Sequence, residues 1–464
     1  MIADLKPYPA LKPSGVPWLG EVPEHWETRR LRNLTNRPIR NGVGEGAQPF
    51  REDWPRYIRI TDIASARKLK EKGKASLPPV KASPSLLEDG DLLLAAVGAT
   101  YGKSFLYSAK FGKSCFAGYL VRLAPDSSVV PSFLSYWTES SAYWDQVNAS
   151  VIQATIQNFS ASRYKALRVL LLPLDEQEAI VRFLDWVDGR IGRAVGLKER
   201  EIALLEEQKQ AIITEAVTRG LDKSVALKPS GVPWLGEVPE HWEVVRLKTL
   251  LVPRSSATSD QVIVGELRVA LEDVRPLTGE LREVDQSKPS FSQGCVFRKG
   301  DILYSKLRPN LGKVLLARAD GLCVGELMPL RSVGETDSSV FVEKVLRSKP
   351  IVALVTSSTS GARMPRTDWG FLGSVRVPLP SPAEQRQIVR FLDVETARVD
   401  RAGDRLRREI DLLGEYRTRL ISDVVTGKLD VREAAKGLPE QPEELDDSEA
   451  DAGVQKPLEQ AEAA

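Results

Sequence analysis

The sequence predicts an α+β protein in which two mixed α/β modules are separated by a pair of long helices, with an internal pseudo-two-fold duplication. Three observations predict this fold. Seventeen residues, LKPSGVPWLGEVPEHWE, occur at 11–27 and again, unchanged, at 227–243. A second repeat aligns 176–222 with 384–430 at 22 identities in 47 positions. Between the repeats lie stretches of about 140 residues with strand and turn signals, and 464 residues suffice for two or three cores.

The composition is that of a globular protein without membrane segments. Apolar residues make up 42% and charged residues 28% of the chain, and no apolar run approaches the roughly 18–20 residues that span a bilayer. The first ten residues lack the basic and apolar regions of a signal peptide. Cys115, Cys295 and Cys323 show no Cys-x-x-Cys spacing. We therefore expect a cytoplasmic protein with no membrane partner, disulfide framework or zinc site.

The net charge of +2 conceals a separation of charge along the chain. Nine acidic residues and one lysine lie in 438–464, so residues 1–437 carry +10. A body of this charge could bind a polyanion, although a solvated basic surface would explain it too. The segment 431–464 has the acidic, proline-containing composition of a disordered tail.

The N-terminal arm, 1–27, and its second copy, 223–243, are rich in proline and glycine and predict an extended arm. His25 and His241, the two histidines of the chain, occupy the same position in the two copies. Neither has a nucleophile or an acid placed for catalysis, so we expect structural hydrogen bonds from both. Packing against a module surface is expected of the four tryptophans: Trp18, Trp26, Trp234 and Trp242.

The modules, 28–172 and 244–377, resemble one another only in two pairs of motifs. These are YIRITDI (57–63) with LRVALEDV (267–274), and GDLLLAAVGATYGK (90–103) with GDILYSKLRPNLGK (300–313). In the second pair a Gly-Asp turn precedes an apolar strand and a later turn ends in Gly-Lys, which predicts strand-turn-strand. We therefore expect the repeats to perform one task twice, and the modules to perform two versions of another.

The second repeat predicts two long helices, within 173–222 and 378–430. Each would run about 40 residues, or roughly 60 Å. Apolar residues recur every seven positions and would pack between the helices as a pseudo-symmetric coiled coil, or alternatively against each helix's own module. These are Leu184, Ile191, Leu205, Ile212, Leu392, Val399, Leu406, Leu413 and Leu420.

The sequence contains no complete catalytic motif. GATYGKS at 98–104 is one residue short of a phosphate-binding loop and leads into a strand rather than a helix. The Glu-x-Lys of Glu207 and Lys209 falls inside the heptad pattern, and no amino-methyltransferase tetrapeptide occurs. We expect no catalysis and no bound cofactor or metal.

Basic residues on the predicted strands and turns favour nucleic acid as the partner, because they can bind phosphates and arginine can read guanine edges. Taken singly, each is better explained as a solvated turn residue, and only the set, repeated in both modules, favours nucleic acid. The candidate DNA-binding residues are Arg51, Arg56, Arg59, Lys68, Lys70, Lys103, Arg268, Arg275, Lys306, Arg308, Lys313, Arg363 and Arg366.

Together, GVPWLGEVPEHWE followed by RRL or VRL, YIRITDI, GDLLLA, GDILYS, and the helix starts PLDEQEAIVRFLD and PSPAEQRQIVRFLD resemble the specificity subunits of type I restriction-modification enzymes. The resemblance covers about residues 11–430. It implies two target-recognition domains that each read half of a bipartite, asymmetric double-stranded DNA target, separated by antiparallel helices. It implies no active site in this chain.

The resemblance also implies partners. Two modification subunits would dock on the duplicated frame and methylate adenine with S-adenosylmethionine. Restriction subunits would join them and use ATP and magnesium. A scaffold of another multi-subunit system, with modules that have lost DNA readout, stays open, whereas the absent motifs disfavour an independent nuclease.

Overall fold

The computed structural model describes residues 5–150, 159–254, 267–282, 291, 294–333, 337–359 and 365–439. The chain divides into two compact units, Met1–Leu197 with Arg408–Glu449, and Lys198–Arg407 with Ala450–Ala464. Because this division cuts across both long helices, the segment boundaries expected from the sequence stay a prediction.

The first unit holds the first module, the start of one long helix and the end of the other. Its helices are α1 (Pro79–Ala82), α2 (Pro131–Trp137), α3 (Ser141–Ser150), α4 (Ala161–Ala166), the beginning of α5 (Leu174–Arg219) and α10 (Arg432–Ala435). Its strands are β1 (Leu11–Pro13), β2 (Glu21–Pro23), β3 (Glu27–Arg30), β4 (Arg40–Asn41), β5 (Gln48–Pro49), β6 (Arg56–Ile58), β7 (Ile63–Ser65), β8 (Lys68–Leu69), β9 (Ala75–Ser76), β10 (Leu92–Ala95), β11 (Ser104–Leu106), β12 (Ser114–Phe116), β13 (Leu120–Leu123) and β14 (Arg168–Leu171).

The second unit repeats this plan. Its helices are α6 (Asp337–Leu346), α7 (Lys349–Ser357), α8 (Trp369–Ser374) and the beginning of α9 (Pro382–Val425). Its strands are β15 (Leu227–Pro229), β16 (Glu237–Pro239), β17 (Glu243–Arg246), β18 (Leu251–Pro253), β19 (Leu267–Val269), β20 (Cys295–Phe297), β21 (Ile302–Ser305), β22 (Val314–Leu316), β23 (Gly321–Cys323), β24 (Leu327–Ser332) and β25 (Arg376–Leu379).

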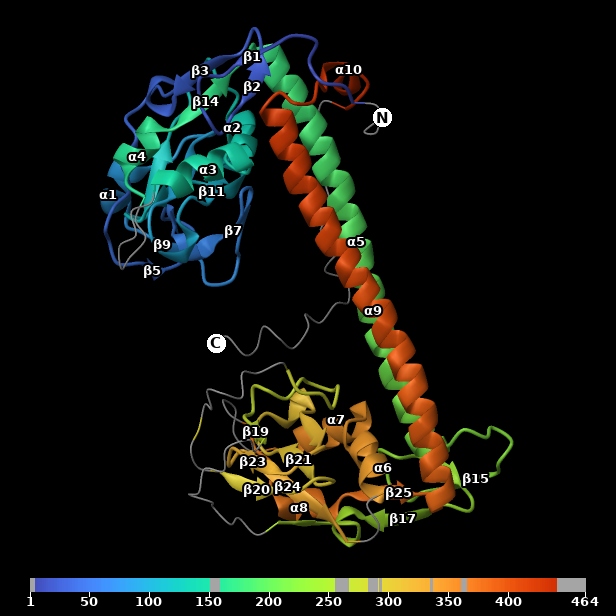
Figure 1. Ribbon diagram of the computed structural model, residues 1–464. Coiled ribbons are helices and arrows are strands. Elements are labelled where there is room, and N and C mark those ends of the chain that lie inside the picture. The colour runs from blue at the N-terminus through green and yellow to red at the C-terminus, as the bar shows by residue number, and fades with distance from the viewer. Residues whose placement is uncertain are drawn as a thin grey trace. The chain divides into compact units, whose positions relative to one another are not determined.

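The two modules share a sheet topology that their sequences barely show. Antiparallel sheets run β11-β10-β13-β4 in the first module and β22-β21-β24-β18 in the second. Each module also contains one parallel pair, β6 with β12 and β19 with β23. The central strands β10 and β21 are buried along their whole length, which explains their continuous apolar sequences. The α+β prediction with mixed modules is confirmed (Figure 1).

The repeated opening segment is a hairpin, so the extended arm expected from its prolines and glycines is wrong. Strands β1 and β2 pair with Leu11 opposite Pro23, and β15 and β16 pair in the same register. The hairpin closes because Gly15 and Gly20, at φ +70° and +63°, adopt the left-handed conformation that the turn requires.

Helices α5 and α9 pack on each other, and they are antiparallel (Figure 1). In the second unit Glu206 of α5 pairs with Arg407 of α9. Lys209, further along α5, pairs with Asp400, which comes earlier in α9. The two helices therefore run in opposite directions. Of the nine heptad residues, five are buried and four half-buried. The heptad stripe therefore faces the interior along both helices.

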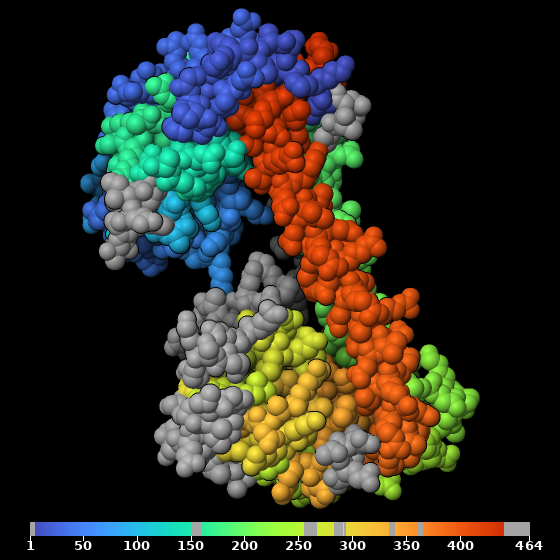
Figure 2. All heavy atoms as spheres, viewed as in Figure 1, coloured from blue at the N-terminus to red at the C-terminus, as the bar shows by residue number. Residues whose placement is uncertain are grey.

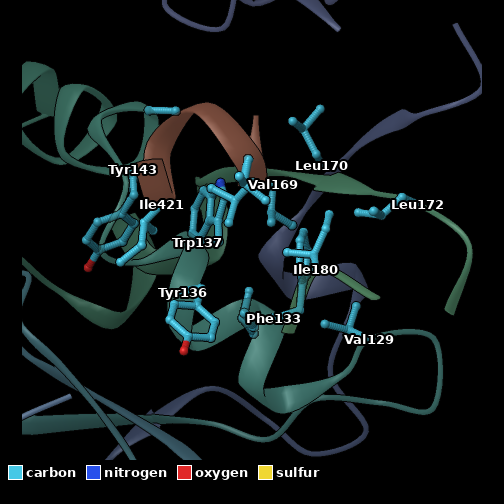
Figure 3. Close-up of a cluster of buried hydrophobic side chains, with 14 of the residues drawn as sticks. Val129, Phe133, Tyr136, Trp137, Tyr143, Val169, Leu170, Leu172, Ile180 and Ile421 are labelled. Carbon is cyan, nitrogen blue, oxygen red and sulfur yellow. The ribbon is translucent and has the colours of Figure 1, made fainter. Parts of the chain in front are cut away.

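Each unit has a main core in which module, hairpin and both helices meet. In the first unit Ile180 of α5 and Ile421 of α9 pack with aromatic residues of α2 and α3 such as Phe133 and Tyr143 (Figure 3). In the second, Ile213 of α5 and Leu392 of α9 join the module residues. The helix pair and its modules thus share their cores, which combines the two packing alternatives left open by the sequence.

None of the described helices has an apolar stretch long enough to cross a membrane.

Candidate nucleic-acid interface

A hydrogen-bonded junction anchors the first hairpin to the first turn of α5. Glu176 is almost fully buried there, and its carboxylate accepts hydrogen bonds from Trp26 Nε1 at 2.9 Å and from His25 Nε2 at 2.7 Å. Arg432 donates to the same carboxylate at 3.2 Å. Burial raises the pKa of Tyr8, which keeps its hydroxyl as a further donor to Glu176. A buried charge with several donors is well satisfied, so this junction holds the hairpin in place.

The second hairpin is anchored in the same way to α9. Glu384, at the position equivalent to Glu176, accepts from His241 Nε2 at 2.9 Å and from Trp242 Nε1 at 3.3 Å. Burial acts to raise the pKa of Glu384, but hydrogen bonds from His241, Trp242 and Ser381 outweigh it and hold this pKa below its ordinary value. The duplicated segment therefore repeats because it binds a duplicated helix start.

The end of the opposite helix completes each junction. Gly427, just after α9, adopts φ +77°, and a β-carbon there would lie 2.3 Å from Pro23 and 3.0 Å from Trp26. Gly220, just after α5, adopts φ +75° against Trp242. Figure 2 shows the atoms at the start of the chain in blue against the end of α9 in red, where Asp430 N donates to Lys6 O. We call the two hairpins, the two junctions and the helix pair the frame.

The expectation that both histidines make structural hydrogen bonds is confirmed. The packing expectation is confirmed for Trp26 and Trp242, which are fully buried, and for Trp234, which packs against the core of the second unit. It is wrong for Trp18, because 41% of this side chain is exposed. Sequence reasoning missed Glu176 and Glu384. The dipeptide Glu-Gln at the start of both repeats was the available signal, but an acid in the first turn of a helix is common for other reasons.

In the second module three loops meet, and two of them carry predicted basic residues. Lys306 N donates to Glu326 O, and Arg308 N donates to Pro365 O, each at 2.9 Å. Arg366 pairs with Glu326 at 2.7 Å and remains largely exposed. We call Lys306, Arg308, Glu326 and Arg366 the second loop cluster. The structure thus brings three of the predicted DNA-binding residues together.

The first module builds the equivalent cluster from other side chains. Ala96 N donates to Tyr119 O and Phe159 N donates to Ala96 O, which reproduces the bonds of Lys306 with Glu326 and Thr367. Gly98 stands where the second module has Arg308. Tyr119 is 66% exposed at the loop tip. We call Ala96, Gly98, Tyr119 and Phe159 the first loop cluster.

Arg308 has an unusual backbone for a residue with a side chain. Its φ of 50° and ψ of 57° are left-handed, a conformation that costs a non-glycine residue roughly 1–2 kcal/mol. Gly98, at φ +74°, adopts a positive φ at the same place without that cost. Strain of this kind concentrates at functional sites, which makes Arg308 a candidate for a functional residue.

Three predicted residues lie in the module interiors. The guanidinium of Arg56 donates to Lys70 O and pairs with Glu71. Arg268 donates to Phe291 O, and Lys313 Nζ donates to Leu271 O. All three are buried, and their charged groups donate hydrogen bonds to carbonyl oxygens of the module itself. They are therefore not part of the candidate interface. Strand alternation alone did not show which face was inside.

The remaining predicted residues are spread over the modules. Arg51 forms an ion pair with Asp53 and stacks over Trp54 at 4.4 Å. Arg59 forms an ion pair with Asp62. Arg275 lies 3.6 Å from Glu280. Lys68, Lys70 and Lys103 are exposed. Arg363 lies outside the described residues. DNA contact by any of these residues stays a prediction.

A half-buried ionic network ties the first module to the helix pair and was not expected from the sequence. Arg67, beside Lys68 on the β7–β8 hairpin, pairs with Asp185 of α5 at 2.9 Å and stacks over Tyr136 at 3.8 Å. Arg417 of α9 pairs with Asp188 of α5 at 2.8 Å. The hairpin that carries two predicted DNA-binding lysines therefore rests on the frame.

Known proteins resemble this chain along most of its length. No family model matches the chain. It is 24% identical over 439 residues to the putative type I restriction enzyme MjaX specificity subunit of Methanocaldococcus jannaschii, covering 89% of this chain and 96% of that protein. It is 22% identical over 280 residues to the type I restriction enzyme EcoDI specificity subunit of Escherichia coli, covering 57% and 62%.

A solved structure shares the fold. A chain from a study of complex assembly and conformational transition of the type I R-M system matches with a TM-score of 0.62 at 17% identity, covering 88% of this chain and 99% of that one. The MjaVIII specificity subunit of M. jannaschii adds a 22% match over 369 residues, 75% of this chain and 81% of that protein. With its duplicated frame and paired modules, this chain is similar along most of its length to type I restriction enzyme specificity subunits.

Proposed function

We propose that this chain reads a bipartite, asymmetric sequence in double-stranded DNA, one half-site per module, and presents two equivalent docking surfaces to modification subunits. A DNA-recognition role follows from the family. The observation that carries the finer proposal is the contrast between two junctions with the same hydrogen bonds and two loop clusters with different side chains. A frame that repeats suits identical partners, whereas loops that differ suit different half-sites.

The loop clusters have the chemistry needed to read DNA. Lys306 and Arg308 lie on the loop between β21 and β22, and Arg366 lies on the loop before α8, where side chains can enter a groove. Arginine can bind the O6 and N7 of guanine with two hydrogen bonds, which discriminates between bases by about 1–3 kcal/mol. The first cluster offers Tyr119 instead, a flat side chain with one hydroxyl. The two modules would therefore favour different bases.

The helix pair offers two equivalent apolar positions for a partner. Leu204 of α5 and Leu412 of α9 occupy the same place in the repeat and are 60% and 61% exposed. Single exposed leucines are ordinary, but the same exposure at both copies supports docking of the same partner twice. We propose two modification subunits there, with restriction subunits joining through them.

Cofactors would be bound by those partners. We propose that the modification subunits hold S-adenosylmethionine and that the restriction subunits hold ATP and magnesium. The complex would work in the cytoplasm, where its DNA substrate lies. A scaffold without DNA readout is the alternative, and the different side chains of the two loop clusters disfavour it because a scaffold has no need of two different modules.

The first experiment is to co-express the chain with the modification subunit encoded beside it, purify the complex, and map methylated adenines across a genome by single-molecule sequencing. A motif of two short specific parts with a fixed gap is the expected result. A stable complex that methylates nothing would favour the scaffold.

A second experiment tests the loop cluster. Charge reversal of Lys306 and Arg308 to glutamate should weaken target binding by about 10- to 100-fold or more, since each good contact is worth about 1–3 kcal/mol, and should leave the bound modification subunit in place. The matched control reverses Lys299 and Arg318, two exposed cations at the opposite end of β21 and β22. Unchanged affinity at moderate salt would remove Lys306 and Arg308 from the interface.

A further inference from the structure

Each module begins and ends on a two-stranded sheet that the sequence did not lead us to consider as a binding site. The first module enters through β3 and leaves through β14, and these strands pair with each other. The second enters through β17 and leaves through β25, which pair in the same way. We call these two sheets the necks of the modules.

At each neck two arginines lie directly opposite one another. Arg30 is the cross-strand partner of Arg168, and Arg246 is the cross-strand partner of Arg376. All four are exposed. The matching register at both necks places the pair at equivalent positions of the duplicated frame, although the modules between the strands have diverged.

No acidic residue in the described part of the chain neutralises the positive charge of these pairs. Within the described part of the chain, none of the four side chains makes a hydrogen bond or an ion pair. Like charges directly opposite on antiparallel strands are unfavourable, so each neck carries a repulsion that the free protein does not relieve. Neighbouring Arg29 differs, because Glu27 binds it at 2.6 Å.

Further cations surround the necks. Arg32 follows β3 and Lys248 follows β17 at the equivalent position, and both are exposed and without an ion pair among the described residues. Arg168 also lines an open groove together with Lys12, Arg29 and one acid, Glu27. Arginine at one neck and lysine at the other indicates that positive charge, rather than a particular hydrogen-bond fork, is what this position supplies.

The necks lie close along the chain to the loop clusters. Six-residue α8, about 9 Å long, separates the Arg366 loop from Arg376. In the first module six-residue α4 separates Phe159 from Arg168 in the same manner. In both modules the chain therefore passes from the loop cluster to the neck through one short helix.

Building on the DNA-reading role proposed above, we propose that the cross-strand pairs Arg30–Arg168 and Arg246–Arg376 are sequence-independent clamps on the phosphate backbone of the target duplex. Phosphates supply closely spaced negative charges along a strand and neutralise both members of a pair. Phosphate contacts position a protein without reading sequence. This explains why the pairs are the same at two modules that read different half-sites.

The experiment measures binding of the complex with its modification subunit to target and non-target duplexes from 50 to 300 mM salt. The variant Arg30→Gln, Arg168→Gln, Arg246→Gln, Arg376→Gln should bind both duplexes more weakly, and the slope of log K against log salt should fall by about 3 to 4, since each phosphate contact contributes about 0.9. The ratio of target to non-target affinity and the methylated motif should stay unchanged. The control is Arg29→Gln, whose charge Glu27 already compensates.

Free-chain stability gives a second readout. Arg30→Gln or Arg168→Gln alone should raise Tm slightly, because either change removes the like-charge pair, whereas Arg29→Gln should not. An unchanged salt slope in the fourfold variant would overturn the clamp. Loss of the modification subunit with an unchanged slope would overturn it in favour of a protein interface. Failure of the unaltered complex to bind or methylate DNA would instead refute the proposed function itself.

Discussion

The two loop clusters share two backbone hydrogen bonds and have different side chains, whereas the two junctions have the same side chains in different surroundings. In the clusters, Ala96 and Lys306 bond to Tyr119 and Glu326 through the backbone alone. Side chains there can vary without loss of the loop. At the junctions the bonds come from side chains, so His, Trp and Glu cannot vary.

The junctions differ in how completely they are enclosed. Glu176 is 7% exposed because residues from both ends of the described chain, Tyr8 and Arg432, cover it. Glu384 is 31% exposed, with Ser381 in their place. The same bonds should therefore stabilise the first unit more than the second, because water competes less for a buried carboxylate.

The largest expected effect comes from removing the tryptophan of either junction. Trp26→Ala and Trp242→Ala should each lower the free energy of unfolding by about 3–5 kcal/mol, since both side chains are fully buried. Urea unfolding followed by circular dichroism checks the loss, and hydrogen exchange locates it. Trp18→Ala, at a side chain that is 41% exposed, is the control and should cost less. A much smaller loss of unfolding free energy at one junction than at the other would show that the two tryptophans are not equivalent.

Replacing the glutamate of each junction by glutamine should destabilise the two junctions by different amounts. Glu176→Gln should destabilise by about 1–3 kcal/mol, because the amide turns a donor toward Trp26, His25 or Arg432. Glu384→Gln should lose less than about 1 kcal/mol. Equal losses in urea unfolding would show that enclosure does not distinguish the junctions.

Replacing Arg308 by glycine, the residue of the first cluster at this position, should stabilise the chain by up to about 1 kcal/mol while weakening DNA binding. Thermal unfolding and a binding titration on the same preparation check both effects. Lys299→Gly, which alters an exposed cation away from the cluster, is the control. A glycine variant that lost stability would show that the arginine side chain outweighs its backbone strain.

The smallest effect concerns acid stability. Because the folded pKa of Glu384 is lowered, its contribution is present above the unfolded pKa of about 4.3 and is lost as pH falls through the folded pKa. Glu384→Gln should therefore unfold with a shallower pH dependence below about pH 4.3. An identical dependence in both proteins would contradict the lowered pKa.

The duplicated frame could be predicted because repetition is visible letter by letter. The heptads of α5 and α9 and the paired His25 and His241 followed from position alone. The hairpin did not, since β1 and β2 are three-residue strands rich in proline whose pairing depends on Gly15 and Gly20.

The candidate site was harder to predict, because basic side chains on short strands carry no signal of which face is buried. Arg56 and Arg268 have the same local pattern as exposed arginines but turn inward to carbonyl oxygens. The necks could not be predicted, because Arg30 and Arg168 are 138 positions apart in the sequence and only strand pairing makes them neighbours.

The junctions also bear on how such a chain could change over generations. The bonds of Trp26 to Glu176 and of Trp242 to Glu384 join residues that are identical in both repeats. A genetic exchange that replaced the coding segment between one hairpin and the following helix would leave these contacts intact. New specificities could then arise by recombination of whole modules, without compensating mutations in the helix pair.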